Sequence, residues 1–222
     1  YELAQDNQAE GVRYIEVRFA PQLHQNDLMN CIDVMAALNR GLNRAKEEFN
    51  SKPEVAGGME PPFEYGIIAC AMRMFDYGFS RYFDTLLNVH ANSDRKWIFS
   101  VASQELVRAA VEARTKLNLP IVGFDLAGAE AGYPAEDHAP AYALAHKNFL
   151  KKTVHAGEAY GPESIFQAIT DLHADRLGHA LHLFDADTIK SHEIKDKQAY
   201  IDNLVQFIAD RRITIEVCLT SN

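Results

Sequence analysis

The stretch Thr153-Val154-His155-Ala156-Gly157-Glu158 combines an imidazole and a carboxylate at a spacing that could support chemistry. Its apolar-leaning start predicts a strand that ends at the histidine, and the two small residues predict a turn that carries the glutamate. Parallel α/β folds hold their reactive groups at the carboxyl ends of strands. A His-x-x-Glu pair is also common on ordinary surfaces, so the interpretation depends on what else the fold brings to this place.

Two further predicted strands end near residues that could take part in the same site. The strand 120–126 is apolar except for Asp125, and a buried carboxylate is unfavourable unless it is paired. We therefore expect Asp125 to support another polar side chain by hydrogen bonding. Gly128 is either a place where the backbone approaches a ligand closely or a plain turn glycine. His179 lies near the end of the strand 176–182, where a lone histidine is more often structural.

Strands and helices alternate along the chain. We predict strands at 12–19, 65–72, 120–126, 153–155, 176–182 and 213–218, and helices at 28–49, 104–117, 140–150, 163–172 and 198–211. This order is typical of a parallel sheet with crossover helices. Because polar residues gather near several strand ends, we predict an α/β fold of the (β/α)8 TIM-type barrel, with residues 1–222 as a single domain. An open doubly wound sheet is the alternative, although no G-x-G-x-x-G loop follows the first strand.

Glu16 and Arg18 are two residues apart in the first predicted strand and therefore point to the same side of the sheet. They form either an ordinary polar strand face or, in a closed barrel, a buried and mutually paired set.

The composition indicates a globular protein that handles a small molecule. Of the 222 residues, 47% are hydrophobic and 24% are charged, which allows one domain with a substantial core. The net charge of −9 argues against a nucleic-acid partner, and the sequence has no long apolar run that would span a membrane. The three cysteines are widely spaced, so we expect buried or half-buried free thiols in a reducing compartment, the cytoplasm. The oligomeric state stays open.

Four motifs and one strand, in this order and spacing, resemble the adenosine deaminase family. They are Tyr14-Ile15-Glu16-Val17-Arg18-Phe19-Ala20-Pro21, Gly123-Phe124-Asp125-Leu126-Ala127-Gly128-Ala129-Glu130, Val154-His155-Ala156-Gly157-Glu158, Arg176-Leu177-Gly178-His179 and Ile215-Glu216-Val217-Cys218-Leu219-Thr220-Ser221-Asn222. The resemblance covers nearly the whole chain. The Asp-Leu-Ala-Gly and His-Ala-Gly-Glu motifs are far more specific together than either is alone.

The resemblance implies a zinc-dependent barrel hydrolase that converts adenosine, or its 2'-deoxy analogue, to inosine and ammonia. It implies that His155 is one zinc ligand and that Glu158 protonates the purine ring nitrogen, which requires a raised pKa in a dry or crowded site. It further implies that His179 orients or deprotonates the attacking water and that the backbone of Gly128 contacts the purine. A deaminase of adenine or AMP, or an inactive purine-binding relative, are the alternatives.

The sequence also departs from the family pattern. The expected His-x-His pair would precede Tyr1 and the expected Asp-Asp pair would follow Asn222, so we interpret the chain as an internal portion with barrel strands two to seven. Expressed alone, it is expected to have little or no activity. Ala180 replaces the glycine usual after the histidine. The segments 51–62 and 75–99 look longer than usual, and the aromatic residues of the second are expected mainly to pack.

Overall fold

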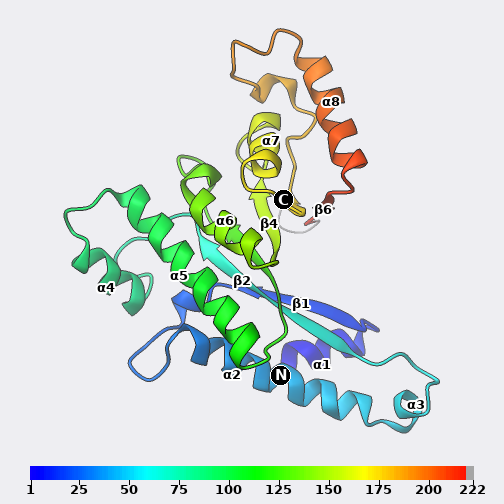
Figure 1. The fold of residues 1–222 in the computed structure, drawn as a ribbon. Coiled ribbons are helices and arrows are strands. Elements are labelled where there is room, and N and C mark those ends of the chain that lie inside the picture. The colour runs from blue at the N-terminus through cyan, green and yellow to red at the C-terminus, as the bar shows by residue number, and fades with distance from the viewer. Residues whose placement is uncertain (219–222) are drawn as a thin grey trace.

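The computed structural model describes residues 1–218, and within them six parallel strands form one curved sheet (Figure 1). The strands are β1 (Tyr14–Phe19), β2 (Glu64–Met72), β3 (Ile121–Ala127), β4 (Lys151–Ala156), β5 (Arg176–His179) and β6 (Thr214–Glu216). All six predicted strands are therefore present. The end of the last predicted motif, Leu219 to Asn222, lies outside the described residues.

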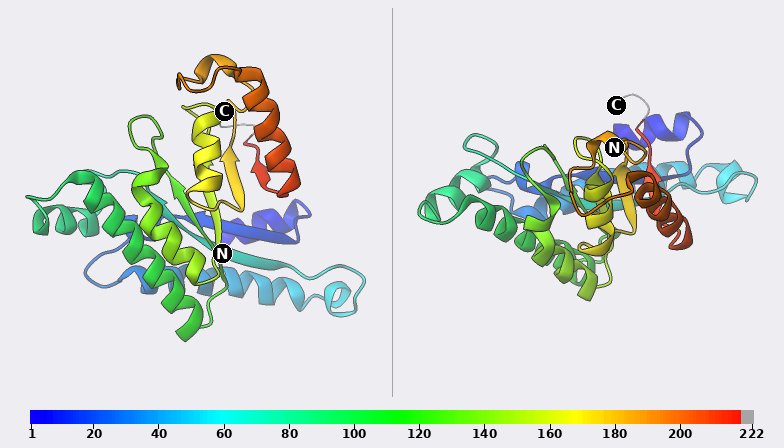
Figure 2. Two further views of the ribbon diagram at one scale, coloured as in Figure 1. Left: turned by 45° about the horizontal axis from the view of Figure 1, so that its top comes forward. Right: turned by 90° about the horizontal axis from the view of Figure 1, so that it is seen from above.

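The strand order identifies the fold as part of a barrel. Each strand pairs in parallel with the next one along the chain, in the order β1-β2-β3-β4-β5-β6, whereas a doubly wound sheet reverses its order at a switch point. Figure 2 (left) shows β4 and β5 standing steeply to β1 and β2, the change of direction that curls the sheet. The expectation of an incomplete (β/α) barrel is confirmed.

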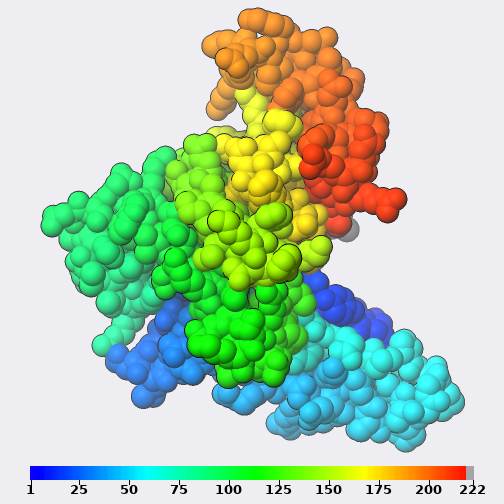
Figure 3. Space-filling model, viewed as in Figure 1, coloured from blue at the N-terminus to red at the C-terminus, as the bar shows by residue number. Residues whose placement is uncertain are grey.

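The crossover helices cover the sheet. The helices of the described residues are α1 (Glu2–Ala9), which precedes the sheet, and α2 (Cys31–Asn50), α3 (Pro53–Ala56), α4 (Arg81–Val89), α5 (Arg95–Lys116), α6 (Ala139–Lys147), α7 (Pro162–Thr170) and α8 (Lys197–Asp210), which lie between strands, with short 3-10 turns at Pro21–Leu23, Ala135–His138 and Ala186–Thr188. Helices α2 and α5 pack on β2, and α6 and α7 pack on β4. In the space-filling view, atoms of α5 and α6 cover the centre of the sheet (Figure 3). The main core, which includes Leu42, Ile67, Phe124 and Leu177, lies between these layers.

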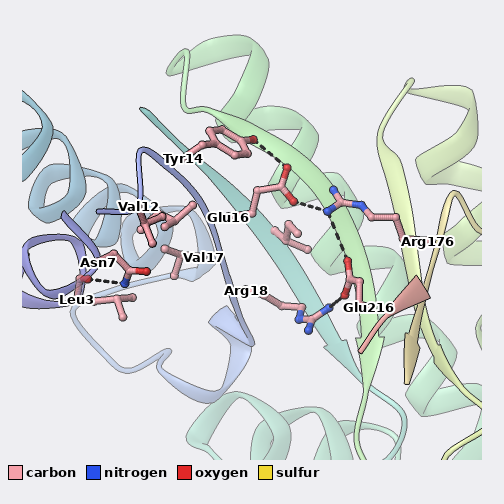
Figure 4. A pocket seen from close by; sticks show the side chains of 11 residues that line it. Leu3, Asn7, Val12, Tyr14, Glu16, Val17, Arg18, Arg176 and Glu216 are labelled. Carbon is pink, nitrogen blue, oxygen red and sulfur yellow. Dashed lines mark hydrogen bonds and ion pairs between the residues drawn. The ribbon is translucent and has the colours of Figure 1, made fainter. Parts of the chain in front are cut away.

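Charged side chains line the inside of the curl, where β1 faces β5 and β6 (Figure 4). Glu16 pairs with Arg176 at 2.5 Å, and Arg18 pairs with Glu216 at 2.7 Å, across 198 positions of sequence. These residues border a hollow of about 660 Å³. Glu16 and Arg18 do share a side of the sheet, as predicted, but each is half-buried and pairs across the curl instead of with the other.

Two helix starts differ from the prediction because the capping residue differs. Helix α2 begins at Cys31, not near residue 28, since Asn30 accepts hydrogen bonds from the amides of Ile32 and Asp33, and Asp33 returns one. Leu28, at the predicted start of the helix, is 90% exposed. Helix α5 begins at Arg95, about two turns before the predicted start, because Asp94 caps it.

The cysteines and aromatic residues largely follow expectation. Cys31 and Cys70 are buried, Cys218 is half-buried, and all three are free thiols. A second core, built around the stacked rings of Phe75 and Phe83, joins α4 to the start of α5. Tyr77, Phe79 and Trp97, by contrast, lie exposed on the surface. None of the helices among residues 1–218 is long and apolar enough to cross a membrane.

Candidate active site

Strands β4 and β5 bring two histidines together at their carboxyl ends. His155 pairs in register with Gly178, and Ala156 pairs with His179, so the two imidazoles lie on neighbouring strands. Their ring centroids are 5.2 Å apart. A side chain at Gly178 would approach the His155 ring to 3.0 Å, so the glycine makes room for this imidazole. The Glu158 carboxylate lies 3.8 Å from His179 Nε2, and the three predicted residues therefore gather in one place.

Asp125 lies next to the His155 ring. Its side chain is fully buried at the end of β3, 3.2 Å from His155 Nδ1. A carboxylate accepts hydrogen bonds, so Nδ1–H of His155 is the donor in this pair. Arg18 Nε lies 3.4 Å from the same carboxylate, and the Cys70 thiol lies 3.5 Å from it. Asp125 thus links the charged lining of the curl to His155.

Side chains, and not a neighbouring strand, hold the backbone of β4 on its β3 side. The β3–β4 ladder ends at the pair Phe124–Lys152, before the strand reaches its polar end. Beyond that point the Tyr142 hydroxyl donates to the carbonyl of Thr153 at 2.6 Å. The guanidinium of Arg73, which is 1% exposed, donates to the carbonyl of His155. Because buried carbonyls need partners, these two side chains replace the missing ladder bonds.

A buried histidine in turn orders the start of the loop after β2. His138 Nε2 lies 3.1 Å from the carbonyl of Arg73, and its Nδ1 lies 2.7 Å from the Ser103 hydroxyl. Since a carbonyl only accepts, Nε2–H donates to Arg73. The single hydroxyl proton of Ser103 is shared between Nδ1 and the carbonyl of Phe99, which lies 3.1 Å from the hydroxyl. Burial lowers the pKa of His138 from 6.5 to about 4, so the ring is neutral.

Positive φ angles mark the ends of β3, β4 and β5. Gly128 after β3 has φ of 107° and Gly157 after β4 has φ of 77°, values that glycine adopts readily. His179 and Ala180 also have positive φ, of 68° and 48°. Ala180 therefore holds a conformation that alanine rarely adopts. Such strained residues concentrate at functional sites.

The described residues fit one ligand of a metal site and do not complete it. A histidine whose Nδ1 is hydrogen-bonded to a carboxylate, as His155 is to Asp125, is the arrangement that metal-bound imidazoles show in proteins, with Nε2 as the ligating atom. Among residues 1–218, however, no group of three His, Cys, Asp or Glu side chains is arranged to hold a metal ion. A catalytic zinc needs at least three protein ligands. The Glu158 side chain is 46% exposed, so the described residues do not provide the dry surroundings expected for it.

Three residues of this region were not identified from the sequence. Arg73 and Glu130 were not assigned any role, and Arg18 was considered only as part of a polar strand face or as a partner of Glu16, not as a partner of Asp125. Glu130 is 3% exposed and accepts hydrogen bonds from the amides of residues 157–160. Nothing in the local sequence pattern indicates these contacts, because they join different loops.

The curled sheet, with its polar residues at the carboxyl ends of the strands, is part of a (β/α)-barrel protein. The chain belongs to the adenosine deaminase family, whose family model matches residues 1–222. The adenosine deaminase of Mycobacterium marinum is 32% identical to it over 222 residues, which are 100% of this chain and 51% of that protein. The chain thus spans about half the length of the curated relatives it matches.

Solved structures of similar fold include related enzymes. The N6-methyl-AMP deaminase of Arabidopsis thaliana superimposes with a TM-score of 0.64 at 25% identity, over 100% of this chain and 51% of that chain. An amidohydrolase from Burkhoderia ambifaria with bound Zn superimposes with a TM-score of 0.67 at 19% identity, over 98% of this chain and 46% of that chain. The second likeness concerns the fold alone.

Proposed function

We propose that the complete protein is a zinc-dependent hydrolase that converts adenosine, or its 2'-deoxy analogue, to inosine and ammonia. The observation that carries this proposal is the cluster of His155, His179 and Glu158 at the ends of β4 and β5. Family membership supports the deamination chemistry, and the curated relatives named adenosine deaminase support the nucleoside substrate.

The side chains of this chain would carry the proton transfers. Water attacks C6 of the purine, and electron density moves onto the adjacent ring nitrogen. Glu158 donates a proton to that nitrogen, so no charge accumulates there, and His179 accepts a proton from the attacking water. The C6–N bond then breaks: the amino group leaves as ammonia with the proton held by His179, and the proton of the new C6 hydroxyl returns to the Glu158 carboxylate. The two groups lie 3.8 Å apart, close enough to serve the two sides of one addition. The backbone turn at Gly128 would lie against the purine ring.

His155 is the residue proposed to hold the zinc ion, through Nε2, with Asp125 fixing the ring. Bound zinc supplies a water molecule whose pKa is lowered towards neutrality. Membership of the adenosine deaminase family supports this choice of metal. The remaining ligands would come from parts of the protein outside residues 1–222. We also propose a cytoplasmic location, which the free thiols support.

The test is an absorbance assay of the complete protein with adenosine, 2'-deoxyadenosine, adenine and AMP, together with its metal content. We expect the nucleosides to react and one zinc per chain. Preferred turnover of adenine or AMP would reassign the substrate. AMP is a specific alternative because of the likeness to an N6-methyl-AMP deaminase. No turnover with no zinc would identify a catalytically inactive relative and overturn the proposal.

Replacement of Glu158 tests its role. Glu158→Gln removes the acidic proton and keeps the shape, so we expect kcat to fall by about 10²–10⁴ with zinc content unchanged. Asp185→Asn is the matched control, because Asp185 also pairs with a histidine, His182 at 3.3 Å, but outside the cluster. A Glu158→Gln variant as active as the Asp185→Asn variant would contradict the assignment.

A further inference from the structure

One buried carboxylate, that of Glu130, gathers the whole loop between β4 and α7. It accepts hydrogen bonds from the amides of Gly157 (3.0 Å), Glu158 (3.0 Å), Ala159 (2.7 Å) and Tyr160 (3.1 Å), and from the hydroxyl of Ser164 (2.7 Å). Four consecutive amides of a loop thus converge on one side chain that comes from the loop after β3. Charge-assisted bonds of this kind are stronger than bonds between neutral groups.

Glu130 is ionised in this position despite its burial. Burial alone would raise its pKa, but hydrogen bonds from the amide of Ala159, the hydroxyl of Ser164 and the amide of Gly157 outweigh burial and hold the pKa below its usual value. An ionised carboxylate only accepts hydrogen bonds, which matches the donors around it. The ionised Glu130 carboxylate therefore binds the loop amides and has no proton to donate as an acid.

The loop has little freedom to move away from Glu130. Gly157 has a positive φ, and even a Cβ atom there would come within 2.6 Å of Ile165, so the backbone packs directly on α7. On the opposite side, Arg73 holds the carbonyl of His155. The main chain from His155 to Tyr160 is thus fixed by side chains at both ends.

We propose that Glu130 is a positioning residue for the deamination reaction, because it fixes the backbone from which Glu158 projects towards the substrate. This inference rests on the proposed function. The Glu158 side chain is 46% exposed and its carboxylate lies 3.8 Å from His179 Nε2, which is too long for a hydrogen bond. The anchored backbone therefore determines where the acidic group lies. A displacement of about 1 Å at such a group can lower a rate about 100-fold.

The experiment compares Glu130→Gln with the wild type in the complete protein. Glutamine keeps the size of the side chain but turns an NH₂ group towards the amide donors. We expect faster hydrogen exchange of the amides of residues 157–160 without substrate, a fall in kcat of about 100-fold, a KM close to the wild-type value and unchanged zinc content. Glu130→Asp keeps the negative charge on a shorter side chain. We expect it to change the hydrogen exchange and kcat less than Glu130→Gln does. If Glu130→Gln does not fold, Glu130→Asp decides the question.

Glu163→Gln is the matched control. Glu163 also accepts hydrogen bonds from two loop amides, those of Lys190 (2.8 Å) and Ser191 (3.0 Å), but this loop carries none of the clustered residues. The Glu163→Gln variant should leave kcat and the hydrogen exchange of the amides of residues 157–160 unchanged. Unchanged exchange in the Glu130 variants, or faster exchange with an unchanged kcat, would overturn the proposal. If the wild type deaminates no purine, the proposed function fails, and the exchange data still decide whether Glu130 orders the loop.

Discussion

The buried His138 should make the stability of the protein depend on pH in a defined window. Its neutral ring joins Ser103 to the carbonyl of Arg73, and burial lowers its pKa from 6.5 to about 4. Between these two values the unfolded chain binds a proton at this position and the folded chain does not. The contribution is therefore fully present above pH 6.5 and is lost as the pH falls towards 4.

The size of the effect follows from the shift. One pKa unit corresponds to 1.36 kcal/mol, so a fall from 6.5 to about 4 makes the free energy of unfolding about 3 kcal/mol smaller at the acid end of the window. For a protein of marginal stability this is a large fraction of the total.

Urea denaturation of the complete protein across this window measures the effect. In the His138→Gln variant the side-chain amide can still donate to Arg73 but cannot titrate. The difference in the free energy of unfolding between wild type and variant should therefore change by about 3 kcal/mol between pH 6.5 and about 4. Ser103→Ala is the control, because it weakens the same cluster and keeps the imidazole. It should lower stability and retain the wild-type slope. Equal slopes for the wild type and His138→Gln would refute the reasoning.

Two further substitutions have outcomes that the contacts predict. Asp125→Asn leaves His155 Nδ1 without its carboxylate, so the zinc affinity of the complete protein should fall about 10–100-fold. Competition with a chelator measures this affinity. An unchanged zinc affinity would exclude the supporting role of Asp125. Phe149, which is 91% exposed with φ of 58°, follows the end of α6 in a conformation that suits glycine. Phe149→Gly should raise the free energy of unfolding by about 1 kcal/mol, whereas Phe149→Ala, which keeps the Cβ atom, should not; equal effects of the two variants would contradict this explanation.

The strand pattern and the clustered residues could be predicted from the sequence because both are local signals. Each strand is an apolar or alternating run, and His155, Asp125 and His179 lie at or near the ends of such runs. Parallel strands bring their carboxyl ends to one edge, so the neighbourhood of His155 and His179 follows from topology.

The parts that could not be predicted depend on contacts between distant segments. The start of α2 was placed too early because Leu28 continues an apolar period, while the capping box at Asn30 determines the true start. Glu130 holds a loop about 30 positions away and Arg73 holds the end of a strand about 80 positions away, so neither shows a local pattern. The exposure of Glu158 likewise depends on the chain that surrounds it.

Along β4, hydrogen bonds from side chains take the place of backbone ladder bonds, and this affects how the site can evolve. Backbone hydrogen bonds persist through almost any mutation, whereas the bonds from Tyr142 and Arg73 each depend on a single codon. The depth of the His155 imidazole in the barrel mouth can therefore be tuned by point mutations that never touch the histidine itself.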